Sequence, residues 1–444
     1  MNTFSGGLHL KYNKESTEFK PIKELPSPQR VVIPLQQNLG CPNDPLVKVG
    51  DEVFEGQKIG DSPKFVSAPV HTSISGKVIK IEKLPNPCGF DVASIVIEAK
   101  DGVRGVGYGV SPKKLEEMTP DEIRRIVREA GIVGMGGAAF PTHVKLTPPA
   151  GKLIDTLIIN GCECEPYITA DHRLMLERAD DIIFGSLVLA KAVGAQNILI
   201  GVEDNKKDAV GALSTSDEKH HLGKNSPIKI VEVETKYPQG GEKQLIQTLL
   251  DREVPSGKLP LDVGVVVNNV GTAAAVAAAI KHGTPLIKRV LTVTGPGMKE
   301  RHNFLVRIGT SFEEVIKHSE GLFDDACKVV MGGPMMGLAV SSLDLPVVKG
   351  TTCLLVFNRK EALIYEEKDC IRCGRCIKHC PAGLMPNFLS DYVKLKDWEK
   401  VEEYHVADCI ECGCCSYVCP SRIFLVQYFK AAKQELQLRK AVCQ

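Results

Sequence analysis

Cys370-Ile-Arg-Cys373-Gly-Arg-Cys376-Ile-Lys-His-Cys380-Pro381 is the most informative stretch of this sequence. The same spacing recurs in Cys409-Ile-Glu-Cys412-Gly-Cys-Cys415-Ser-Tyr-Val-Cys419-Pro420. Eight of the sixteen cysteines of the chain therefore occupy equivalent positions in two copies of one pattern. In each copy three cysteines lie on one tight loop, and a fourth cysteine stands directly before a proline.

This spacing is typical of bacterial two-cluster ferredoxins. Three cysteines on a tight loop can hold three corners of an iron–sulfur cube, but the proline turns the chain away before the fourth can reach back. The fourth cysteine is therefore expected to bind the other cluster. One [4Fe–4S] cluster is assigned to Cys370, Cys373, Cys376 and Cys419, and the other to Cys409, Cys412, Cys415 and Cys380.

Zinc binding and disulfide formation are the alternatives for these cysteines. Zinc sites usually combine two cysteine pairs, or cysteine with histidine, and lack the third and fourth cysteines of this pattern. A disulfide framework is not expected in a large chain without a secretory signal. Cys414 adjoins Cys415 but lies outside the repeated spacing, so it is interpreted as a spare small residue.

Composition limits the possible functions of the chain. Its 444 residues suggest about three or four domains. A net charge of +1 and an aromatic content of 5% do not favour binding to nucleic acid. No apolar stretch is long enough to span a membrane, and the N-terminus lacks the plan of a signal peptide. The expected location is the cytoplasm, with any membrane contact made through partner proteins.

The first 110 residues are predicted to form a β domain. Short β-branched runs at 31–33, 78–81 and 94–97 alternate with glycine-containing turns. This arrangement resembles the biotinyl/lipoyl-like barrel-sandwich fold, which presents a modified lysine on a hairpin. The corresponding stretch, Ala68 to Gly76, contains no lysine. We therefore expect a docking module without a swinging arm.

Residues 111–287 are predicted to form an α/β domain with a largely parallel sheet. Its first helix should start at a cap on Thr119 and end at Gly131. Four strands are expected at 157–160, 197–201, 228–233 and 263–267, with helices at 182–193 and 272–280. Ligands of such sheets gather at the carboxyl ends of the strands.

Two smaller units are predicted to complete the chain. Residues 288–356 read as short strands around one helix that starts after Ser311, and form a small α+β module. Residues 357–444 hold the cysteine motifs, a helical stretch near 386–406 and a closing helix from Ser421 to Lys440.

A glycine-rich loop runs from Gly134 to Lys145. Backbone without side chains can approach a flat or anionic ligand closely. Phe140 offers a ring for stacking and Lys145 a charge for a phosphate. The loop is neither a Walker loop nor the usual dinucleotide fingerprint. A purely structural glycine turn is the alternative.

Two further stretches follow predicted strands. Asn160-Gly-Cys-Glu-Cys-Glu-Pro166 leaves one strand, and Val267-Asn-Asn-Val-Gly-Thr272 leaves another just before a helix. The free N–H groups and positive dipole end of that helix are a natural seat for phosphate. Asparagine side chains can both donate to and accept from the polar edge of a flavin.

The glycine loop, the acid stretch and Asn268-Asn269 resemble the flavin- and NADH-binding subunit of respiratory complex I. The whole chain is more similar still to the RnfC family, the NAD-facing subunits of the Rnf electron transport complexes. Its opening, Phe4-Ser-Gly-Gly-Leu-His9, and Gly40-Cys-Pro-Asn-Asp-Pro45 carry this resemblance, as does the order of the domains. The resemblance identifies the domains as barrel-sandwich, FMN/NADH-binding α/β domain, β-grasp-like module and α-helical two-cluster ferredoxin domain.

The resemblance also implies a role for particular residues. The residues that would hold FMN are Gly134, Gly136, Gly137, Lys145, Asn160, Glu163, Asn268, Asn269 and Thr272. The residues that would face NAD(H) are Phe140, Glu165, Tyr237, Gly240 and Glu242. No catalytic side chain is implied.

The chain departs from complex I mainly around the nucleotide. Cys162 replaces an aspartate, and Gly240-Gly241-Glu242 replaces a glycine–acid–acid run. A phenylalanine near the adenine has no match after Lys258. Cys162 and Cys164 could bind a metal as a pair. The alternative is a polar substitution beside the flavin without a role in metal binding.

Membership of the Rnf family would make the chain the NAD(H)-facing subunit of a ferredoxin:NAD oxidoreductase that translocates ions. Its expected partners are the ferredoxin-facing iron–sulfur subunit and integral membrane subunits, and its expected place is the cytoplasmic side of the membrane as a peripheral protein. Two alternatives stay open. One is a soluble flavin and iron–sulfur reductase such as a cobalamin reductase, and the other is an electron-wiring subunit with a degenerate nucleotide pocket.

Overall fold

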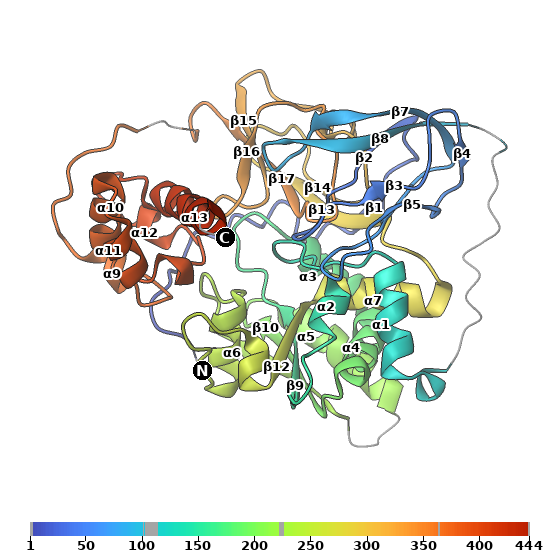
Figure 1. Cartoon of the computed structure of the whole chain (residues 1–444), viewed down its shortest axis with the longest axis horizontal. Coiled ribbons are helices and arrows are strands. Elements are labelled where there is room, and N and C mark those ends of the chain that lie inside the picture. The colour runs from blue at the N-terminus through green and yellow to red at the C-terminus, as the bar shows by residue number, and fades with distance from the viewer. Residues whose placement is uncertain (1–2, 101, 103–113, 222–225, 363–364, 443–444) are drawn as a thin grey trace.

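The chain folds into four parts, and three of them pack around the fourth, the flavin domain. The computed structural model describes residues 3–100, 102, 114–221, 226–362 and 365–442. The barrel-sandwich (blue) and the ferredoxin domain (red) lie at opposite ends of the molecule, with the α/β flavin domain and the β-grasp module between them (Figure 1). The predicted boundary at residues 110 and 111 lies outside the described residues.

The barrel-sandwich domain consists of two antiparallel sheets. One has the order β2-β8-β7-β4 and the other β3-β5-β6. Their strands are β2 (Arg30–Pro34), β3 (Asp44–Pro45), β4 (Glu52–Val53), β5 (Lys58–Asp61), β6 (Val70–His71), β7 (Gly76–Pro85) and β8 (Asp91–Ala99). Val31 and Ile33 alternate with less buried residues along β2, as expected for a strand with one face in a core.

The flavin domain is built on a parallel sheet with the order β11-β10-β9-β12. Its strands are β9 (Thr156–Gly161), β10 (Asn197–Glu203), β11 (Ile228–Val233) and β12 (Val265–Asn269). Its helices are α1 (Pro120–Glu129), α2 (Thr142–Lys145), α3 (Ala170–Glu177), α4 (Ala179–Val193), α5 (Lys207–His221), α6 (Glu242–Leu250) and α7 (Val270–His282). A short 3-10 helix, η2 (Pro260–Val263), replaces the predicted start of β12.

The predicted start of the first helix is confirmed in detail. The Thr119 hydroxyl accepts a hydrogen bond from the Glu122 amide, and the Glu122 carboxylate accepts one from the Thr119 amide. This reciprocal cap satisfies two free donors at the helix start. Gly131, with a φ of +64°, follows the end of α1. One continuous hydrophobic cluster joins Ile33 of the barrel-sandwich to Ile123 and Leu157 of the flavin domain.

The order of the strands creates a ligand crevice. From β9 the chain proceeds through β10 to β11 on one side, and then crosses to place β12 on the other side of β9. Ligands of open parallel sheets bind where the strand order reverses in this way. Asn160 at the end of β9 is paired in register with Asn269 at the end of β12. The two predicted asparagine stretches therefore lie together at this crevice.

The β-grasp module has a six-stranded mixed sheet with the order β1-β14-β13-β17-β15-β16. Its elements are β1 (Ile22–Glu24), β13 (Lys288–Thr294), β14 (His302–Arg307), α8 (Phe312–Lys317), β15 (Ala326–Met331), β16 (Leu338–Val340) and β17 (Cys353–Asn358). The Ser311 hydroxyl caps α8 as predicted. Strand β1, which the sequence did not reveal, comes from the N-terminal segment and pairs parallel with β14.

The ferredoxin domain is helical, and two of its predicted helices differ from expectation. Its helices are α9 (Arg375–Lys378), α10 (Pro386–Leu395), α11 (Trp398–Glu403), α12 (Cys414–Tyr417) and α13 (Leu425–Val442). The stretch near 386–406 is broken because Lys396 is left-handed, with a φ of +57°, and Asp397 caps a new helix. The closing helix starts at Leu425 rather than Ser421, because Arg422 has a φ of +55°.

No described helix combines the length and the apolar character that a membrane span requires.

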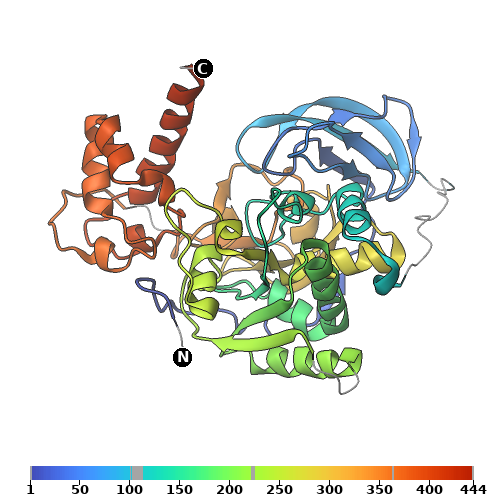
Figure 2. The ribbon, with the colours of Figure 1, turned by 60° about the horizontal axis from the view of Figure 1, so that its bottom comes forward.

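The N-terminal segment, residues 3–20, connects three parts of the molecule. The Gly7 amide donates to the His379 carbonyl of the ferredoxin domain at 3.1 Å. Leu8 exchanges two backbone hydrogen bonds of 2.8 Å with Tyr237 of the flavin domain. Further along, the Thr17 carbonyl accepts from Asn303 of the β-grasp module at 3.0 Å. Figure 2 shows this dark blue segment passing between the ferredoxin and flavin domains.

Lys349, in the β-grasp module, joins that module to the barrel-sandwich and to the flavin domain. Its side chain is buried, and its Nζ donates to the Pro69 carbonyl of the barrel-sandwich at 2.7 Å and to the Gly131 carbonyl at 2.6 Å. Burial lowers the pKa of this amine to about 7. The pKa falls because a charged ammonium loses its hydration and gains no carboxylate partner here.

We predict that Lys349 makes the stability of the protein depend on pH. Between pH about 7 and the ordinary lysine value of 10.5, the unfolded chain binds a proton that the folded chain does not. Stability therefore rises with pH in this window, by up to about 1.4 kcal/mol per pH unit. Lys349→Met should remove this contribution. Thermal unfolding of both proteins between pH about 7 and about 9 measures the difference.

The wild type should gain stability relative to Lys349→Met as pH rises. The exposed Lys83, changed to Met, serves as the control and should leave the pH dependence unchanged. Parallel pH curves for wild type and Lys349→Met would contradict the prediction.

Candidate functional site

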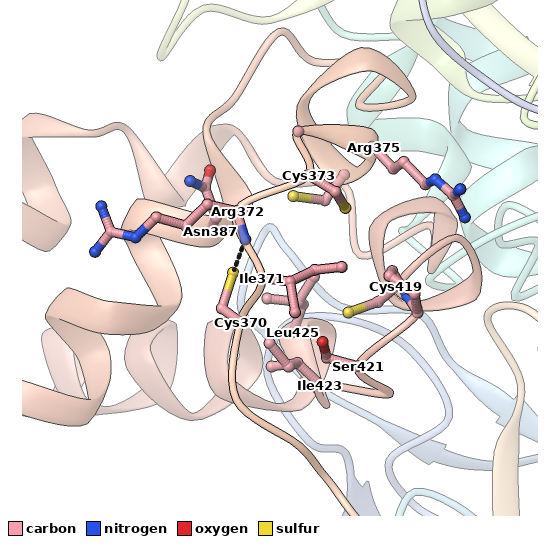
Figure 3. A pocket seen from close by; sticks show the side chains of 13 residues that line it. Cys370, Ile371, Arg372, Cys373, Arg375, Asn387, Cys419, Ser421, Ile423 and Leu425 are labelled. Atoms are coloured by element: carbon pink, nitrogen blue, oxygen red, sulfur yellow. Dashed lines mark hydrogen bonds between the residues drawn. The ribbon is translucent and has the colours of Figure 1, made fainter.

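The first group of cysteines lines one pocket. Cys370, Cys373 and Cys376 surround it together with Cys419 from the second motif, and Ile423 and Leu425 form part of its apolar wall. Figure 3 shows Cys370, Cys373 and Cys419 directed toward this space, while Arg372 and Arg375 point away from it. Four thiols around an apolar pocket fit a [4Fe–4S] cluster.

The second group of cysteines includes Cys380. The pKa of the Cys409 thiol is raised to about 11, first by burial and also by the neighbouring Cys412 and Cys380. Cys415 interacts electrostatically with the same three cysteines. Cys376, in contrast, interacts with Cys419 and Cys370. This grouping is the one that crossed ligation requires, while ligation by these eight cysteines stays a prediction.

Backbone amides point at sulfur atoms in both groups. The Arg372 amide donates to Cys370, the Glu411 amide to Cys409 and the Leu384 amide to Cys380, each at 3.4 Å. Such bonds stabilise negative charge on sulfur and set the reduction potential of a cluster. Cys414, which lies outside the repeated spacing, is buried in an apolar cluster with Leu8 and Tyr237.

The glycine loop forms a cradle at the carboxyl ends of β9 and β12. The Gly134 amide donates to the Phe140 carbonyl at 2.8 Å, and the Met135 amide donates to the Thr272 hydroxyl at 3.0 Å. These bonds fix both ends of the loop, while Gly136 and Gly137 stay exposed. Thr272 therefore anchors the loop from the first turn of α7.

The glycines of the cradle have different reasons to lack a side chain. A Cβ on Gly136 would lie 2.7 Å from Nδ2 of Asn269, so the protein itself requires glycine there. A Cβ on Gly137 would meet no protein atom within 4 Å. Space that the protein leaves open beside a fixed loop fits a ligand that approaches the backbone closely.

The asparagines at the crevice also fit FMN. Asn268 is buried, and its Nδ2 has no hydrogen-bond partner. A buried donor without a partner is costly, and a polar ring edge would satisfy it. Asn269 caps α7 through its Oδ1 and donates from Nδ2 to Asp171 at 2.7 Å. Asn160 donates to the Gly240 carbonyl at 2.8 Å.

Lys145 supplies positive charge at the same crevice. Its Nζ lies 2.7 Å from Oε1 of Glu242 and 3.1 Å from the Val267 carbonyl in the middle of β12. Glu242 starts α6, whose N-terminus faces this region. The side chains of both residues are partly exposed, so Lys145 is within reach of a ligand in the crevice.

Glu163 supports the cradle from within the protein. Its carboxylate accepts from the Asp171 amide at 2.8 Å and the His172 amide at 3.3 Å, at the start of α3. Lys14 of the N-terminal segment is buried beside it and donates to the Glu163 carbonyl. Burial raises the pKa of the Glu163 carboxyl.

Glu165 and Tyr237 lie at the interfaces between domains. The Glu165 carboxylate accepts from the amides of Met335 and Met336, in the loop between β15 and β16, at 3.1 and 2.8 Å. Burial raises the pKa of Glu165 to about 7. The Tyr237 hydroxyl donates to the Cys412 carbonyl at 2.7 Å and is buried. Their role toward NAD(H) stays a prediction, and these contacts give each a second role in docking the domains.

Cys162 and Cys164 make ordinary polar contacts beside the crevice. The Cys162 thiol donates to the Gly201 carbonyl at 3.6 Å, and Cys164 accepts from the Gly240 amide at 3.4 Å. Within the described ranges, no three His, Cys, Asp or Glu side chains gather around the position of a single metal ion.

Sequence analysis did not identify several supporting residues. Asp171 orients Asn269, Lys14 backs Glu163, and Gln244 joins α6 to the Pro381 carbonyl at 3.1 Å. Asp171 lies in the first turn of α3, a helix that was not predicted. Prediction of that helix would have pointed to Asp171. A single lysine or glutamine carries no such signal, because its partner is distant in sequence.

Comparisons with known proteins agree with this arrangement. Residues 2–102 match the family described as RnfC barrel sandwich hybrid domain, residues 127–278 the Nuo51 FMN-binding domain, and residues 362–420 the 4Fe-4S dicluster domain. An NAD⁺-reducing [NiFe]-hydrogenase of known structure contains a chain with the same fold, with a TM-score of 0.52 at 18% identity over 73% of this chain and 65% of that one.

Two curated relatives match almost the whole chain, and both are RnfC-type subunits. The one from the Na⁺-translocating ferredoxin:NAD⁺ oxidoreductase complex of Acetobacterium woodii is 46% identical and covers 98% of this chain and 97% of that protein. The one from the proton-translocating ferredoxin:NAD⁺ oxidoreductase complex of Clostridium ljungdahlii is 45% identical over 98% of this chain and 94% of that protein.

The FMN-binding and dicluster domains define the chain as a flavin- and iron–sulfur-dependent oxidoreductase component. Within this class, the chain belongs to the RnfC family of the ion-translocating ferredoxin:NAD⁺ oxidoreductases, the Rnf complexes.

We predict that Cys380→Ser damages the cluster built on Cys409, Cys412 and Cys415, and spares the cluster nearest in sequence. The reason is that Cys380 lies with the second motif. Iron should fall from about eight atoms per chain toward about four. Iron analysis and EPR of anaerobically purified protein measure both effects.

Cys419→Ser is the matched variant and should damage the opposite cluster, while Cys414→Ser should keep the iron. If Cys380→Ser instead removed the EPR signal of the Cys370 cluster, each motif would have to close on itself.

We also predict that the crevice loses FMN when Gly137 is changed to Val. The added side chain meets no protein atom within 4 Å of its Cβ, so it would occupy the ligand's space rather than strain the loop. Lys145→Ala should weaken FMN retention roughly tenfold to a hundredfold, the effect of losing about 1.5–3 kcal/mol from a charged hydrogen bond. Bound FMN per chain after gel filtration measures both.

Gly211→Val provides the control, because a Cβ on Gly211 of α5 also meets no atom within 4 Å. All variants should keep their iron. Full FMN occupancy in Gly137→Val would show that the loop is a structural turn and that FMN binds elsewhere.

Proposed function

We propose that this chain is the NAD(H)-facing subunit of a membrane-bound, ion-translocating ferredoxin:NAD⁺ oxidoreductase. In this proposal it exchanges a hydride with NAD(H) at the crevice of the flavin domain and exchanges single electrons with a partner subunit through its ferredoxin domain. It works on the cytoplasmic side of the membrane as a peripheral protein.

The observation that carries the proposal is the contact between Tyr237 and Cys412. The hydroxyl–carbonyl distance of 2.7 Å holds the loop of the second cysteine group against the flavin domain. Cys412 is buried at this interface, whereas Cys370 and Cys373 of the first group are exposed. This supports an electron route from the crevice through the buried group to the exposed group, and from there to a partner.

The chemistry requires an adapter between two kinds of carrier. NAD(H) exchanges two electrons as a hydride, and a [4Fe–4S] cluster exchanges one electron; FMN, when bound, does both. The residues of the chain then have three tasks. The glycine loop admits the flavin, Asn268 donates its free Nδ2, and Lys145 balances negative charge on the ligand.

Glu165 and Tyr237 would hold the domains close together along the electron route and exclude water from it. Glu165 bonds to the loop of Met335, and the Met335 carbonyl lies 2.9 Å from where a Cβ on Gly413 would stand. The β-grasp module therefore closes one side of the interface that Tyr237 closes on the other. A closed interface excludes water from the reacting groups.

The proposed partners are the other subunits of the complex, including the ferredoxin-facing iron–sulfur subunit and integral membrane subunits. Similarity to two RnfC-type proteins over nearly their full length supports a subunit of such a complex over a soluble cobalamin-type reductase. The barrel-sandwich domain would serve as a docking module, since residues 68–76 include no lysine that could carry a swinging group.

The test is NADH oxidation by the purified chain after reconstitution with FMN and iron–sulfur clusters. We expect anaerobic NADH oxidation with ferricyanide, at two ferricyanide ions reduced per NADH because each accepts one electron. Gly137→Val should abolish this activity. Cys412→Ser should retain it, since ferricyanide can take electrons before they reach the clusters.

Two results would contradict the proposal. A protein that binds FMN but does not oxidise NADH would be an electron-wiring subunit with a degenerate nucleotide pocket. A protein that reduces a cobalamin at a rate comparable to its NADH oxidation, and does not co-purify with membrane subunits, would be a soluble reductase.

A further inference from the structure

Three carboxylates of the flavin domain gather beside the flavin crevice. Glu163 follows β9 by two residues, Glu203 ends β10, and Asp171 lies in the first turn of α3. Glu163 and Glu203 are buried, and Asp171 is half-buried. A carboxylate that is removed from water stays ionised only when cations or several hydrogen-bond donors lie close to it. The cations that serve these three groups therefore belong to the structure of the crevice.

Two buried lysines pair with the two buried glutamates. Lys206 contacts the Glu203 carboxylate directly, and both side chains are fully buried. Lys14 donates from its Nζ to the Glu163 carbonyl, and the same Nζ lies 3.9 Å from Oε2 of the Glu163 carboxylate. Each buried glutamate thus has one lysine of its own.

The third cation, and one of the two lysines, come from outside the flavin domain. The buried Arg289 of β13, in the β-grasp module, interacts electrostatically with Asp171. Lys206 follows β10 in the flavin domain itself, whereas Lys14 belongs to the N-terminal segment. The flavin domain therefore does not balance its own buried carboxylates. It depends on two other parts of the chain for positive charge.

Other titratable groups nearby are neutral or engaged elsewhere. Glu165 is bonded to backbone amides of the loop between β15 and β16, and the buried His172 is bonded to Asp208 at 2.9 Å. Burial raises the pKa of three thiols and one phenol, which therefore stay neutral: Cys162, Cys164, Cys353 and Tyr12. The three cation–carboxylate pairs thus dominate the charge beside the crevice.

Lys14 is connected to the glycine loop by a short series of contacts. The Glu163 carboxylate accepts a hydrogen bond from the Asp171 amide at 2.8 Å, and the Asp171 carboxylate accepts one from Nδ2 of Asn269 at 2.7 Å. This Nδ2 lies 2.7 Å from where a Cβ on Gly136 would stand. The position and the charge of Lys14 therefore act on residues that border the crevice.

The N-terminal segment is fixed on both sides of Lys14. The Tyr167 amide donates to the Tyr12 carbonyl at 3.1 Å, and the hydroxyls of Thr169 and Thr17 are hydrogen-bonded at 2.8 Å. The Lys14 amine also lies 4.8 Å from the centre of the Tyr12 ring, within the range of a cation–π contact. The ammonium group is thus held in one place by the folded chain.

We infer that Lys14 is a positioning residue of the flavin site, which holds Glu163 in place and balances its charge so that the crevice stabilises reduced FMN. The inference rests on the proposed function, because it concerns the flavin of this crevice. Hydride transfer brings two electrons and one proton to FMN and so adds one negative charge. Without Lys14, an unbalanced carboxylate charge would repel that added charge.

The test measures the midpoint potential of bound FMN in the full-length protein with its clusters. The potential is obtained by anaerobic redox titration with mediator dyes, followed by the absorbance of the flavin, while EPR follows the clusters. A shift of this potential equals a change in the ratio of the affinities for reduced and oxidised FMN. Lys14→Met should lower the potential, because the variant should bind reduced FMN roughly tenfold less tightly relative to oxidised FMN.

A second variant separates charge balance from a general loss of structure. Glu163→Gln should shift the potential in the opposite direction, by roughly tenfold in the same ratio, because it removes a negative charge. The double variant, Lys14→Met with Glu163→Gln, removes both charges and should return the ratio to within about threefold of wild type. If Lys14→Met alone loses its FMN on gel filtration, the double variant should recover it.

Lys11→Met is the matched control. Lys11 is an exposed lysine of the same segment, three residues before Lys14, so the change in net charge is identical. This control should keep the wild-type potential. All variants should keep their iron, because the cysteine motifs are unchanged.

Three outcomes would overturn the inference. They are shifts of the same sign in Lys14→Met and Glu163→Gln, failure of the double variant to restore the wild-type behaviour, and an equal shift in Lys11→Met. The ferricyanide assay separates this inference from the proposed function. NADH oxidation with potentials that do not respond to the variants defeats the role of Lys14 alone. Bound FMN with the expected shifts but no NADH oxidation defeats the proposed function alone.

Discussion

Tyr237 joins the ferredoxin domain to both the flavin domain and the N-terminal segment. Its backbone exchanges two hydrogen bonds with Leu8, and its hydroxyl bonds to the carbonyl of Cys412. One residue therefore links the N-terminal segment, the flavin domain and a cysteine loop. Electron transfer slows steeply with distance. The proposed function of the chain therefore depends on the distance between the crevice and the buried cysteine group.

Buried polar groups, rather than apolar surface alone, fix the other domain junctions. Lys349 joins the barrel-sandwich to the flavin domain, and Glu165 joins the flavin domain to the β-grasp module. Burying such groups costs free energy, which is offset only when the partners lie in one arrangement. A junction built in this way resists sliding, because a small displacement leaves buried donors or acceptors without partners. Precise domain placement suits a protein whose cofactors must keep fixed separations.

Different features of the structure were accessible from the sequence to different degrees. The cysteine spacing and the strand–helix alternation depend on neighbours in the chain, so they could be predicted, as could the cap on Thr119. The break at Lys396 and the late start of the closing helix depend on left-handed residues that propensity does not reveal. Strand β1 pairs with residues about 280 positions away, and no local pattern reports such a partner.

The residues of the candidate site also differ in how far they could be predicted. The glycine loop could be recognised from its run of glycines, and the asparagines from their positions at the ends of strands and the start of a helix. The interdomain roles of Glu165 and Tyr237 could not, since their partners are backbone groups of distant loops.

The path of the N-terminal segment affects how the protein matures. Synthesis delivers residues 3–20 long before His379 and Cys380, whose carbonyls lie beside Gly6 and Gly7. The segment can form these contacts only after the ferredoxin domain has folded. Before then, Phe4 and Leu8, which are buried in the finished protein, stay accessible. A chain whose ferredoxin domain has not folded therefore exposes apolar side chains that the finished protein buries.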